Sequence, residues 1–159
     1  MSYHLTRRRT FGLLLITSFV PIAAWAQQSG STIANARIFD AIGVREGITV
    51  CEIGAGDGAQ TIEVARLVGR GGRVYTSELG EDRLKTLQSR VTASGLSHIT
   101  VVEGGPVRTN FPDAACDAAF MRNVYHHFAD PAAMNPSLAA ALKPGGRLAI
   151  VDLASWCQV

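Results

Sequence analysis

The feature of the chain best suited to chemistry is a glycine-rich turn, residues 54–58 (Gly-Ala-Gly-Asp-Gly), with the carboxyl group of Glu52 two residues before it. A short apolar run precedes the turn and a helical pattern follows it. A glycine motif indicates ligand binding when it lies between a strand and a helix in this way. Gly54 permits a tight turn, and Gly56 lets a ligand approach the backbone because no Cβ stands in the way. Gly58 completes the motif, and the free N–H groups of the following helix face the same crevice. The pattern predicts a nucleotide-binding turn.

Carboxyl groups near the turn narrow the choice of nucleotide. Residues 54–59 also satisfy the dinucleotide pattern G-x-G-x-x-A, so a nicotinamide cofactor is an open alternative. Glu52 suits a cationic ligand group such as an amine, and suits a pyrophosphate poorly. Glu78, near the end of the second predicted strand, could accept hydrogen bonds from the ribose hydroxyls of either ligand. Asp57 either reaches the ligand or caps the next helix.

A second group of polar side chains follows the fourth apolar run of the chain. Residues 121–128 read Met-Arg-Asn-Val-Tyr-His-His-Phe, and ligands bind at the carboxyl ends of parallel strands. Tyr125, His126 and His127 are the groups available to take a proton from a nucleophile. Adjacent histidines point in different directions, so we expect at most one to face the cleft and the other to make a structural hydrogen bond. His98 lies at the start of another strand, so no metal site is predicted.

Alternating strand and helix patterns must position these groups. They predict an α/β fold, a Rossmann-like doubly wound parallel sheet of about five strands with helices on both faces. The near-continuous apolar character of the strands agrees, because such a sheet is buried on both sides. The predicted strands are 48–53, 73–77, 98–102, 116–121 and 147–153, and the predicted helices are 32–42 (capped by Ser31), 60–68, 81–93 and 131–142.

Three of these features together resemble the class I S-adenosylmethionine (SAM) dependent methyltransferase family. The family's first motif, an acid followed by G-x-G-x-G, matches Glu52 and residues 54–58. Its acid after strand two matches Glu78, and its turn before strand five, often L-x-P-G-G, matches residues 142–146. The resemblance covers roughly residues 33–153.

The resemblance implies roles for individual residues. The glycine turn would line the methionine part of SAM, Glu52 would help to hold its amino group, and Glu78 would accept hydrogen bonds from both ribose hydroxyls. Arg122 and Asn123 would contact the cofactor carboxylate. The family often has Gly-Asp after strand three, whereas this chain has Glu-Gly-Gly at 103–105. Adenine is therefore expected to rest on backbone and apolar contacts, or on the acid at position 103.

The resemblance also implies a strand order. The family's sheet usually has seven strands in the order 3-2-1-4-5-7-6, so this chain is expected to form 3-2-1-4-5 and to be C-terminally incomplete. Strand five would then be an edge, and its apolar run at 148–153 invites pairing with another chain. Two alternatives stay open: a homodimer through this edge, as a partner besides the substrate, or a truncated form of a longer protein.

The N-terminal residues are typical of an export signal. Arg7, Arg8 and Arg9 supply positive charge, residues 11–25 are apolar, and 24–26 (Ala-Trp-Ala) offer a small-x-small cleavage site. Residues 8–13 resemble the twin-arginine export signal of bacteria. We therefore divide the chain into a signal, 1–28, and a methyltransferase domain, 29–159, in the periplasm or secreted. A Sec-type signal and an uncleaved membrane anchor are alternatives, although the apolar stretch is short for a bilayer span, and no stable span is expected after cleavage.

Composition excludes other classes of protein. Hydrophobic residues make up 47% of the chain and charged residues 18%, which fits a globular domain and not a disordered one. Without the three arginines at 7–9, 12 basic residues face 13 acidic ones, and no basic run indicates a nucleic-acid partner. The three cysteines match no metal motif, and their odd number argues against a disulfide framework. We predict that Cys51 and Cys116 are small buried hydrophobes.

The function predicted from these observations is SAM-dependent methyl transfer to a small molecule. Two alternatives stay open. One is a nicotinamide-dependent oxidoreductase, because the glycine pattern fits both cofactors. The other is a non-catalytic exported binding protein with the same fold, because a compartment outside the cytoplasm has no obvious supply of SAM.

Overall fold

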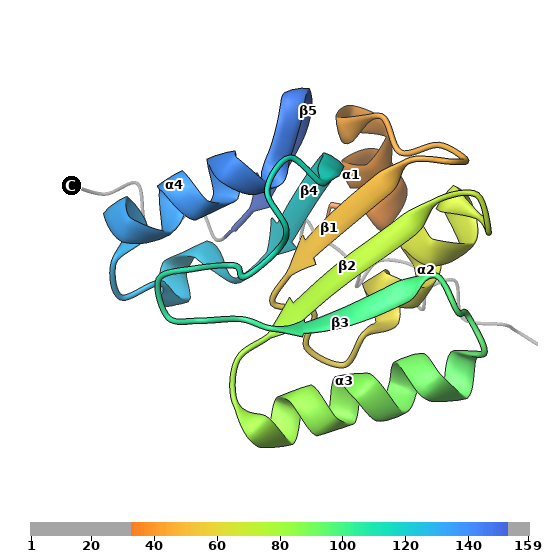
Figure 1. The fold of residues 1–159 in the computed structure, drawn as a ribbon, viewed down its shortest axis with the longest axis horizontal. Coiled ribbons are helices and arrows are strands. Elements are labelled where there is room, and N and C mark those ends of the chain that lie inside the picture. The colour runs from red at the N-terminus through yellow and green to blue at the C-terminus, as the bar shows by residue number, and fades with distance from the viewer. Residues whose placement is uncertain (1–32, 153–159) are drawn as a thin grey trace, which may run out of the picture. The chain divides into compact units, whose positions relative to one another are not determined.

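The computed structural model describes residues 33–152, so the predictions for the export signal, the Ser31 cap and residues 153–159 lie outside it. Helices and strands alternate along this part of the chain as the patterns predict (Figure 1). The elements are α1 (Asn35–Ile42), β1 (Thr49–Ile53), α2 (Ala59–Val68), β2 (Arg73–Glu78), α3 (Glu81–Ser94), β3 (Ile99–Glu103), β4 (Cys116–Arg122), a 3₁₀ turn (Tyr125–His127), α4 (Pro131–Ala141) and β5 (Leu142–Val151).

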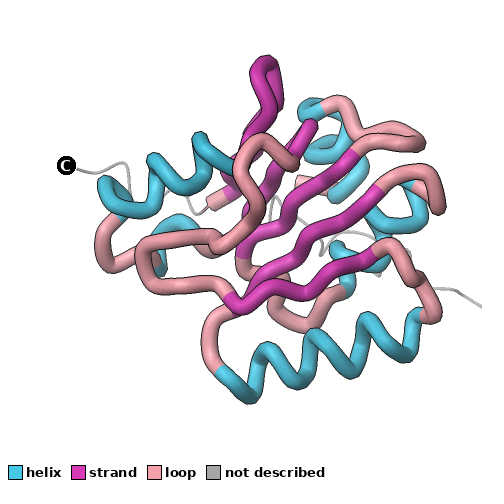
Figure 2. The backbone as a smooth tube through the Cα atoms, viewed as in Figure 1, coloured by secondary structure: helices cyan, strands magenta, loops and turns pink. Residues whose placement is uncertain are grey.

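The five strands form one parallel sheet in the order β3-β2-β1-β4-β5, which confirms the predicted topology (Figure 2). The central strand β1 pairs on both sides, with Val50 opposite Val74 of β2 and Ala118 of β4. In a parallel sheet all strands end at the same edge. The loops after β1, β2, β3 and β4 therefore meet at one edge. The ligand-binding site was predicted at this edge, the carboxyl ends of the strands.

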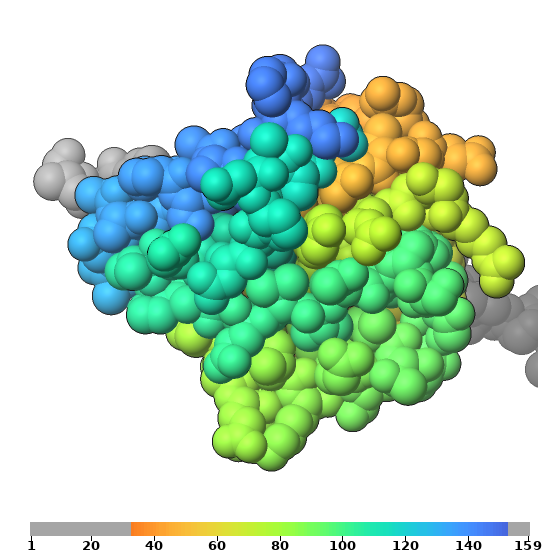
Figure 3. Space-filling model, viewed as in Figure 1, coloured from red at the N-terminus to blue at the C-terminus, as the bar shows by residue number. Residues whose placement is uncertain are grey.

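Helices cover both faces of the sheet, as predicted, because successive residues of a strand point to opposite sides. On β1, Val50 is buried against α1 and α2, whereas its neighbour Cys51 is buried on the other face among side chains of α4. Phe111, from the segment between β3 and β4, belongs to this second cluster. Figure 3 shows that segment lying beside α4 on the face turned toward the viewer.

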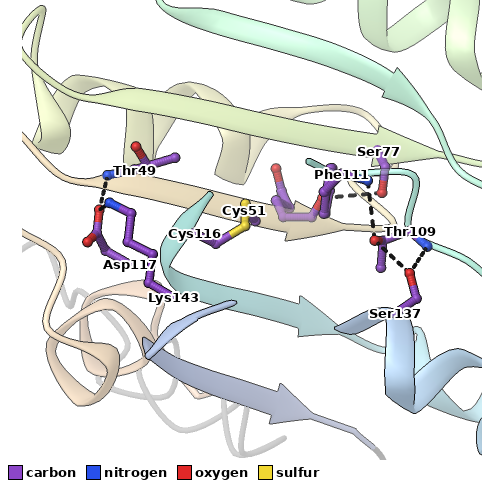
Figure 4. Close-up of a disulfide and its surroundings, with 10 residues drawn as sticks. Thr49, Cys51, Ser77, Thr109, Phe111, Cys116, Asp117, Ser137 and Lys143 are labelled. Carbon is purple, nitrogen blue, oxygen red and sulfur yellow. Dashed lines mark hydrogen bonds and ion pairs between the residues drawn. A yellow bond between two sulfur atoms is a disulfide. The ribbon is translucent and has the colours of Figure 1, made fainter. Parts of the chain in front are cut away.

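The prediction that Cys51 and Cys116 are separate buried hydrophobes is wrong, because they form a disulfide (Figure 4). Both residues are fully buried, as expected, and their Cα atoms lie 5.8 Å apart on the neighbouring strands β1 and β4. The odd cysteine count misled because it does not prevent two of the three cysteines from pairing; the third, Cys157, lies outside the described residues. Parallel strands bring side chains of one face together whatever their separation in sequence.

Most element boundaries lie within one residue of the prediction, but the starts of α1 and β5 differ by more. Helix α1 begins at Asn35 with Ala34 at the N-cap, where no side chain caps the helix. Strand β5 begins at Leu142 and includes the predicted Pro-Gly-Gly turn, because Leu142 pairs with β4 before the pairing shifts register and resumes at Arg147. The residues between them form an irregularity in the strand, with Gly145 at a φ of 80°. Helix α4 has a side-chain cap, since the Asp130 carboxylate accepts a hydrogen bond from the Ala133 N–H.

Candidate functional site

The glycine turn leaves β1 in a conformation that glycine adopts readily. Gly54 and Gly56 have φ values of 70° and 56°, in the left-handed region. A Cβ at Gly54 would lie 2.5 Å from a methyl group of Val124, whereas a Cβ at Gly56 would have no atom within 4 Å. Gly54 therefore permits the loop after β4 to pack against the turn, and Gly56 leaves backbone open for a ligand. Gly58 has another role, because it is the N-cap residue before α2, close to Leu87, and does not line the cleft.

The carboxylate of Glu78 binds backbone N–H groups at the site. It ends β2, is 6% exposed, and accepts hydrogen bonds from the N–H groups of Gly56 at 2.7 Å and Leu79 at 3.0 Å. Arg83 of α3 lies 3.8 Å from the same carboxylate. The predicted acid of strand two therefore lies directly beside the predicted glycine turn.

A cleft of about 590 Å³ opens at this edge of the sheet. Its walls come from the turn after β1, the end of β2, the loop after β3 and the loop after β4. One part is lined by Gly56, Glu78 and Leu79, and another by Val124, Phe128 and other apolar side chains of the loop after β4 and of α4. The arrangement fits a polar ligand portion next to an apolar one.

Glu52 does not line the cleft. Its side chain is 1% exposed on the α2 side of the sheet, where its Oε2 accepts hydrogen bonds from Thr61 and, at 3.2 Å, from Thr76. Burial raises the pKa of Glu52 to about 7; the hydrogen bonds from the two threonines lower it, and the nearby charges of Glu78 and Asp57 raise it. Its Oε1 has no hydrogen-bond partner among the described residues. The predicted role of Glu52 in holding a cofactor amino group is not supported by this placement and stays a prediction.

The carboxylate of Asp57 contacts other groups of the protein in this structure. Its Oδ1 accepts a 3.0 Å hydrogen bond from the Ala59 N–H at the start of α2, and its Oδ2 lies 3.4 Å from Arg90. Asp57 does not line the cleft. Of the two roles that the sequence left open, the geometry corresponds to the helix cap.

Arg122 and Asn123 at the end of β4 both line the cleft. The Arg122 guanidinium donates to the Asn35 side chain at 2.9 Å and to the Ile33 carbonyl, which ties the end of β4 to the start of α1. Asn123 has a φ of 54°, and its N–H donates to the Val151 carbonyl at 2.8 Å. Their predicted contact with the cofactor is compatible with this placement and remains a prediction.

One of the two adjacent histidines lines the cleft and the other does not, as expected, but their side chains do not diverge, because the ring centroids lie 3.9 Å apart. His127 lines the cleft. The Nδ1 of His126 lies 2.6 Å from Oδ1 of Asp152, and the His126 N–H donates to Oδ2 of the same carboxylate at 3.1 Å. Tyr125 does not line the cleft, and its hydroxyl lies 3.4 Å from the Asn135 side chain. Sequence reasoning missed Asp152, although an acid directly after a predicted strand, like Glu78, is a recognisable signal.

The loop after β3 brings no carboxylate to the cleft. Gly104 and Gly105 line it together with Pro106, and the Gly104 N–H donates to the Glu78 carbonyl at 3.0 Å. The exposed side chain of Glu103 lies outside the lining. An adenine ring here would meet backbone and apolar groups, which is the first of the two modes that the sequence left open.

A second, polar cleft of about 280 Å³ lies at the opposite end of the sheet. Its cations have structural partners: Arg45 and Arg147 point at carbonyls at the end of α1, and Lys143 lies 2.8 Å from Asp117 (Figure 4). Burial acts to raise the pKa of Asp117, but hydrogen bonds from Lys143 and the Thr49 N–H, with the charges of Lys143 and Arg45, lower it below its usual value. These contacts account for the charges of this cleft.

Within residues 33–152, no three His, Cys, Asp or Glu side chains form a group that could hold a metal ion. His98 is engaged elsewhere, with its Nε2 2.8 Å from the Ala65 carbonyl.

Residues 33–152 include no helix of the length and apolar character needed to cross a bilayer.

Comparison with known proteins identifies the family. The model of a family described as "Methyltransferase domain" matches residues 51–150. The chain belongs to this family. It is a member of the class I SAM-dependent methyltransferases, as the glycine turn, Glu78 and the strand order indicated.

Known relatives agree with this assignment. The methyltransferase domain is 30% identical over 114 residues to the ubiquinone/menaquinone biosynthesis C-methyltransferase UbiE of Escherichia coli, a match that covers 71% of this chain and 45% of UbiE. A SAM-dependent methyltransferase from Aquifex aeolicus is 27% identical with a TM-score of 0.70, over 74% of this chain and 63% of that one. The chain thus spans less than half the length of the curated relatives that it matches.

A third relative was solved with the cofactor bound. Phosphoethanolamine N-methyltransferase 2 of Haemonchus contortus, in complex with SAM, is 25% identical with a TM-score of 0.65 over 73% of this chain and 27% of that one. SAM is therefore the cofactor of the family to which this chain belongs. The residues at the cleft fit it, because Gly56 leaves backbone open and Glu78 supplies acceptors beside that opening.

Proposed function

We propose that this chain binds SAM in the cleft at the carboxyl edge of its sheet and transfers the methyl group to a small molecule. The observation that carries the proposal is the contact between Glu78 and Gly56. It joins the family's two cofactor motifs at the wall of one cleft. A nicotinamide cofactor is the weaker candidate, because the chain belongs to a methyltransferase family.

Different residues of the chain have different roles in binding and aligning the cofactor. Glu78 accepts hydrogen bonds from the ribose hydroxyls, Gly56 lets the ligand approach the backbone, and Leu79 with Gly104 packs against adenine. Arg122 and Asn123 face the polar end of the cofactor. When bound, SAM supplies a methyl group that passes to the acceptor atom as its carbon–sulfur bond breaks. The chain supplies alignment, because in-line displacement depends on orientation.

The acceptor part of the cleft favours an apolar small molecule. Val124, Phe128, Ala129 and Met134 line it beside His127. The similar protein UbiE carries the name of a C-methyltransferase of quinone biosynthesis. We therefore propose an apolar ring compound as the acceptor, and quinone precursors as the first compounds to screen.

Calorimetric titration of the full chain with SAM, S-adenosylhomocysteine and NADH tests the proposal. SAM and S-adenosylhomocysteine should bind with one-to-one stoichiometry, and Glu78→Ala should abolish binding. Glu81→Ala is the matched control, because Glu81 is exposed and pairs with Lys85 one helical turn away. Binding of NADH alone would overturn the proposal. Binding of SAM without methylation in a broad acceptor screen would favour a non-catalytic binding protein.

We further propose that the chain is exported to an oxidising compartment. The Cys51–Cys116 disulfide supports this, because such bonds persist outside the cytoplasm and are rare within it. The mature protein would then begin near Gln27, after the Ala-Trp-Ala site. Fractionation of bacteria expressing the full chain, with mass spectrometry of its N-terminus, tests this, and an intact cytoplasmic chain would contradict it.

A homodimer through β5 is a separate proposal. Within residues 33–152 this strand is one of the two edges of the sheet, and the side chain of Ile150 is 45% exposed there. Light scattering of the full chain should give twice the monomer mass, and Ile150→Lys should return it to the monomer mass. A monomeric parent chain would contradict the proposal.

A further inference from the structure

Asp152 connects two elements at the acceptor side of the cleft. It follows β5, and both oxygens of its carboxylate contact His126 in the loop after β4, one at the ring and one at the backbone N–H. Both side chains are mostly buried, with 15% and 17% of their surfaces exposed. Two contacts between one carboxylate and one residue fix both the loop and the ring.

The ring contact determines how His126 can act. A carboxylate is an acceptor only, so the proton between the two groups lies on Nδ1 of His126. This contact selects one tautomer and one ring orientation. His126 does not line the cleft, so this fixed ring does not reach the acceptor.

His127 does line the cleft, and its ring is packed on the fixed ring of His126. The ring centroids of the two histidines lie 3.9 Å apart, with planes inclined by 47°. Asp152 therefore orients the cleft histidine through one intermediate ring. The other charged groups that line the same cleft are Glu78, Arg83, Arg108 and Arg122, from the ends of β2 and β4, from α3 and from the loop after β3.

We propose that Asp152 is a positioning residue, which through His126 holds His127 where it can take a proton from the methyl acceptor. This inference rests on the proposed function and adds to it the class of acceptor, a molecule whose nucleophilic atom carries a hydrogen. As the new bond to carbon forms at that atom, its hydrogen leaves as a proton to a ring nitrogen of His127. The electron pair of the broken bond stays on sulfur, so no oxidant or reductant is needed.

Nitrogen-15 NMR of the histidine rings in the full chain tests the inference without an acceptor. Spectra are recorded from pH 5 to 9 for the parent chain and for Asp152→Asn, with S-adenosylhomocysteine binding measured on the same samples. The parent should show His126 as the Nδ1–H tautomer. In Asp152→Asn the titration midpoint of His127 should move by about 0.3 pH unit or more, because the ring of His126 that Asp152 holds packs against the ring of His127.

Matched variants make the result decisive. Asp130→Asn changes a carboxylate of the same region that caps α4, and it should leave the His127 midpoint unchanged. Asp152→Glu should restore the midpoint in part. His126→Gln removes the intermediate ring without altering the end of β5 and should shift the midpoint as Asp152→Asn does.

A His127 midpoint that stays within about 0.3 pH unit of the parent value in both Asp152→Asn and His126→Gln would overturn the inference. The pair would then only fasten the loop to β5. Failure of the proposed function is a different result, because S-adenosylhomocysteine would then not bind the parent chain, whereas the histidine titrations would still be readable.

Discussion

The carboxylate of Glu78 accepts a 2.7 Å hydrogen bond from the backbone N–H of Gly56, so the end of β2 holds the turn that follows β1. Glu78 has both a structural and a binding role in the account, since one oxygen orders the turn and the carboxylate faces the cleft. The site is thereby partly preorganised, which reduces the cost of ordering it when a ligand binds.

Replacing Glu78 by Gln should weaken SAM binding by about 10- to 100-fold, because a hydrogen bond to a charged group contributes about 1.5–3 kcal/mol. Glutamine keeps the size of the side chain and one acceptor, so the fold should persist. Calorimetry with SAM measures the change, and Glu81→Gln is the control. Unchanged affinity in Glu78→Gln would remove this carboxylate from the site.

Gly54→Ala should lower the free energy of unfolding by about 1–3 kcal/mol, because alanine resists the left-handed conformation and its Cβ would contact Val124. Gly47→Ala separates the two causes, since Gly47 has a φ of 84° and no atom near its Cβ position. Adding Val124→Ala should recover part of the loss. Urea unfolding measures the series, and equal losses in Gly54→Ala and Gly47→Ala would refute the contact.

Loss of the Cys51–Cys116 disulfide should destabilise the chain by about 4 kcal/mol, since the bond closes a loop with a sequence separation of 65. Urea unfolding of the oxidised chain, and of chain reduced in urea and refolded under reductant, measures the effect. Cys157→Ala removes the third cysteine and should leave the difference intact. Alkylation of all three cysteines in unreduced, unfolded protein would contradict the bond.

Glu52 should make the stability of the chain depend on pH. Burial raises its pKa from 4.5 to about 7 in the folded state, so the folded state holds a proton that the unfolded state has lost between these values. The free energy of unfolding should therefore fall as pH rises through this window, by about 3 kcal/mol from this residue. Relative to the parent, Glu52→Gln should gain stability between pH 4.5 and 8. Glu81→Gln, at an exposed position, is the control. If the free energy of unfolding of Glu52→Gln followed the same pH dependence as that of the parent or of Glu81→Gln, the buried titration would be contradicted.

The parts of the fold and site that local sequence determines could be predicted. The glycine turn lies between β1 and α2, and Glu78 ends β2, because strand, turn and helix signals are all contained in short segments. That one of His126 and His127 lines the cleft was also expected, whereas the packing of their two rings was not. Strand order, in contrast, came from the family resemblance and not from any single segment.

Contacts between distant segments could not be predicted in the same way. Cys51 and Cys116 are in contact because β1 and β4 are neighbouring strands. The number of residues between the two cysteines does not indicate which strands are neighbours. Asp152 reaches His126 because both follow adjacent strands, β4 and β5. Glu52 was expected in the cleft because it precedes the turn, but strand alternation turns its side chain to the α2 face.

A crystal structure of the full chain with S-adenosylhomocysteine tests the central claim most directly. The account predicts both ribose hydroxyls within hydrogen-bonding distance of Glu78, the amino acid portion over the turn at Gly54 and Gly56, and adenine between Leu79 and Gly104. A ligand bound elsewhere, or bound with its ribose away from Glu78, would contradict it.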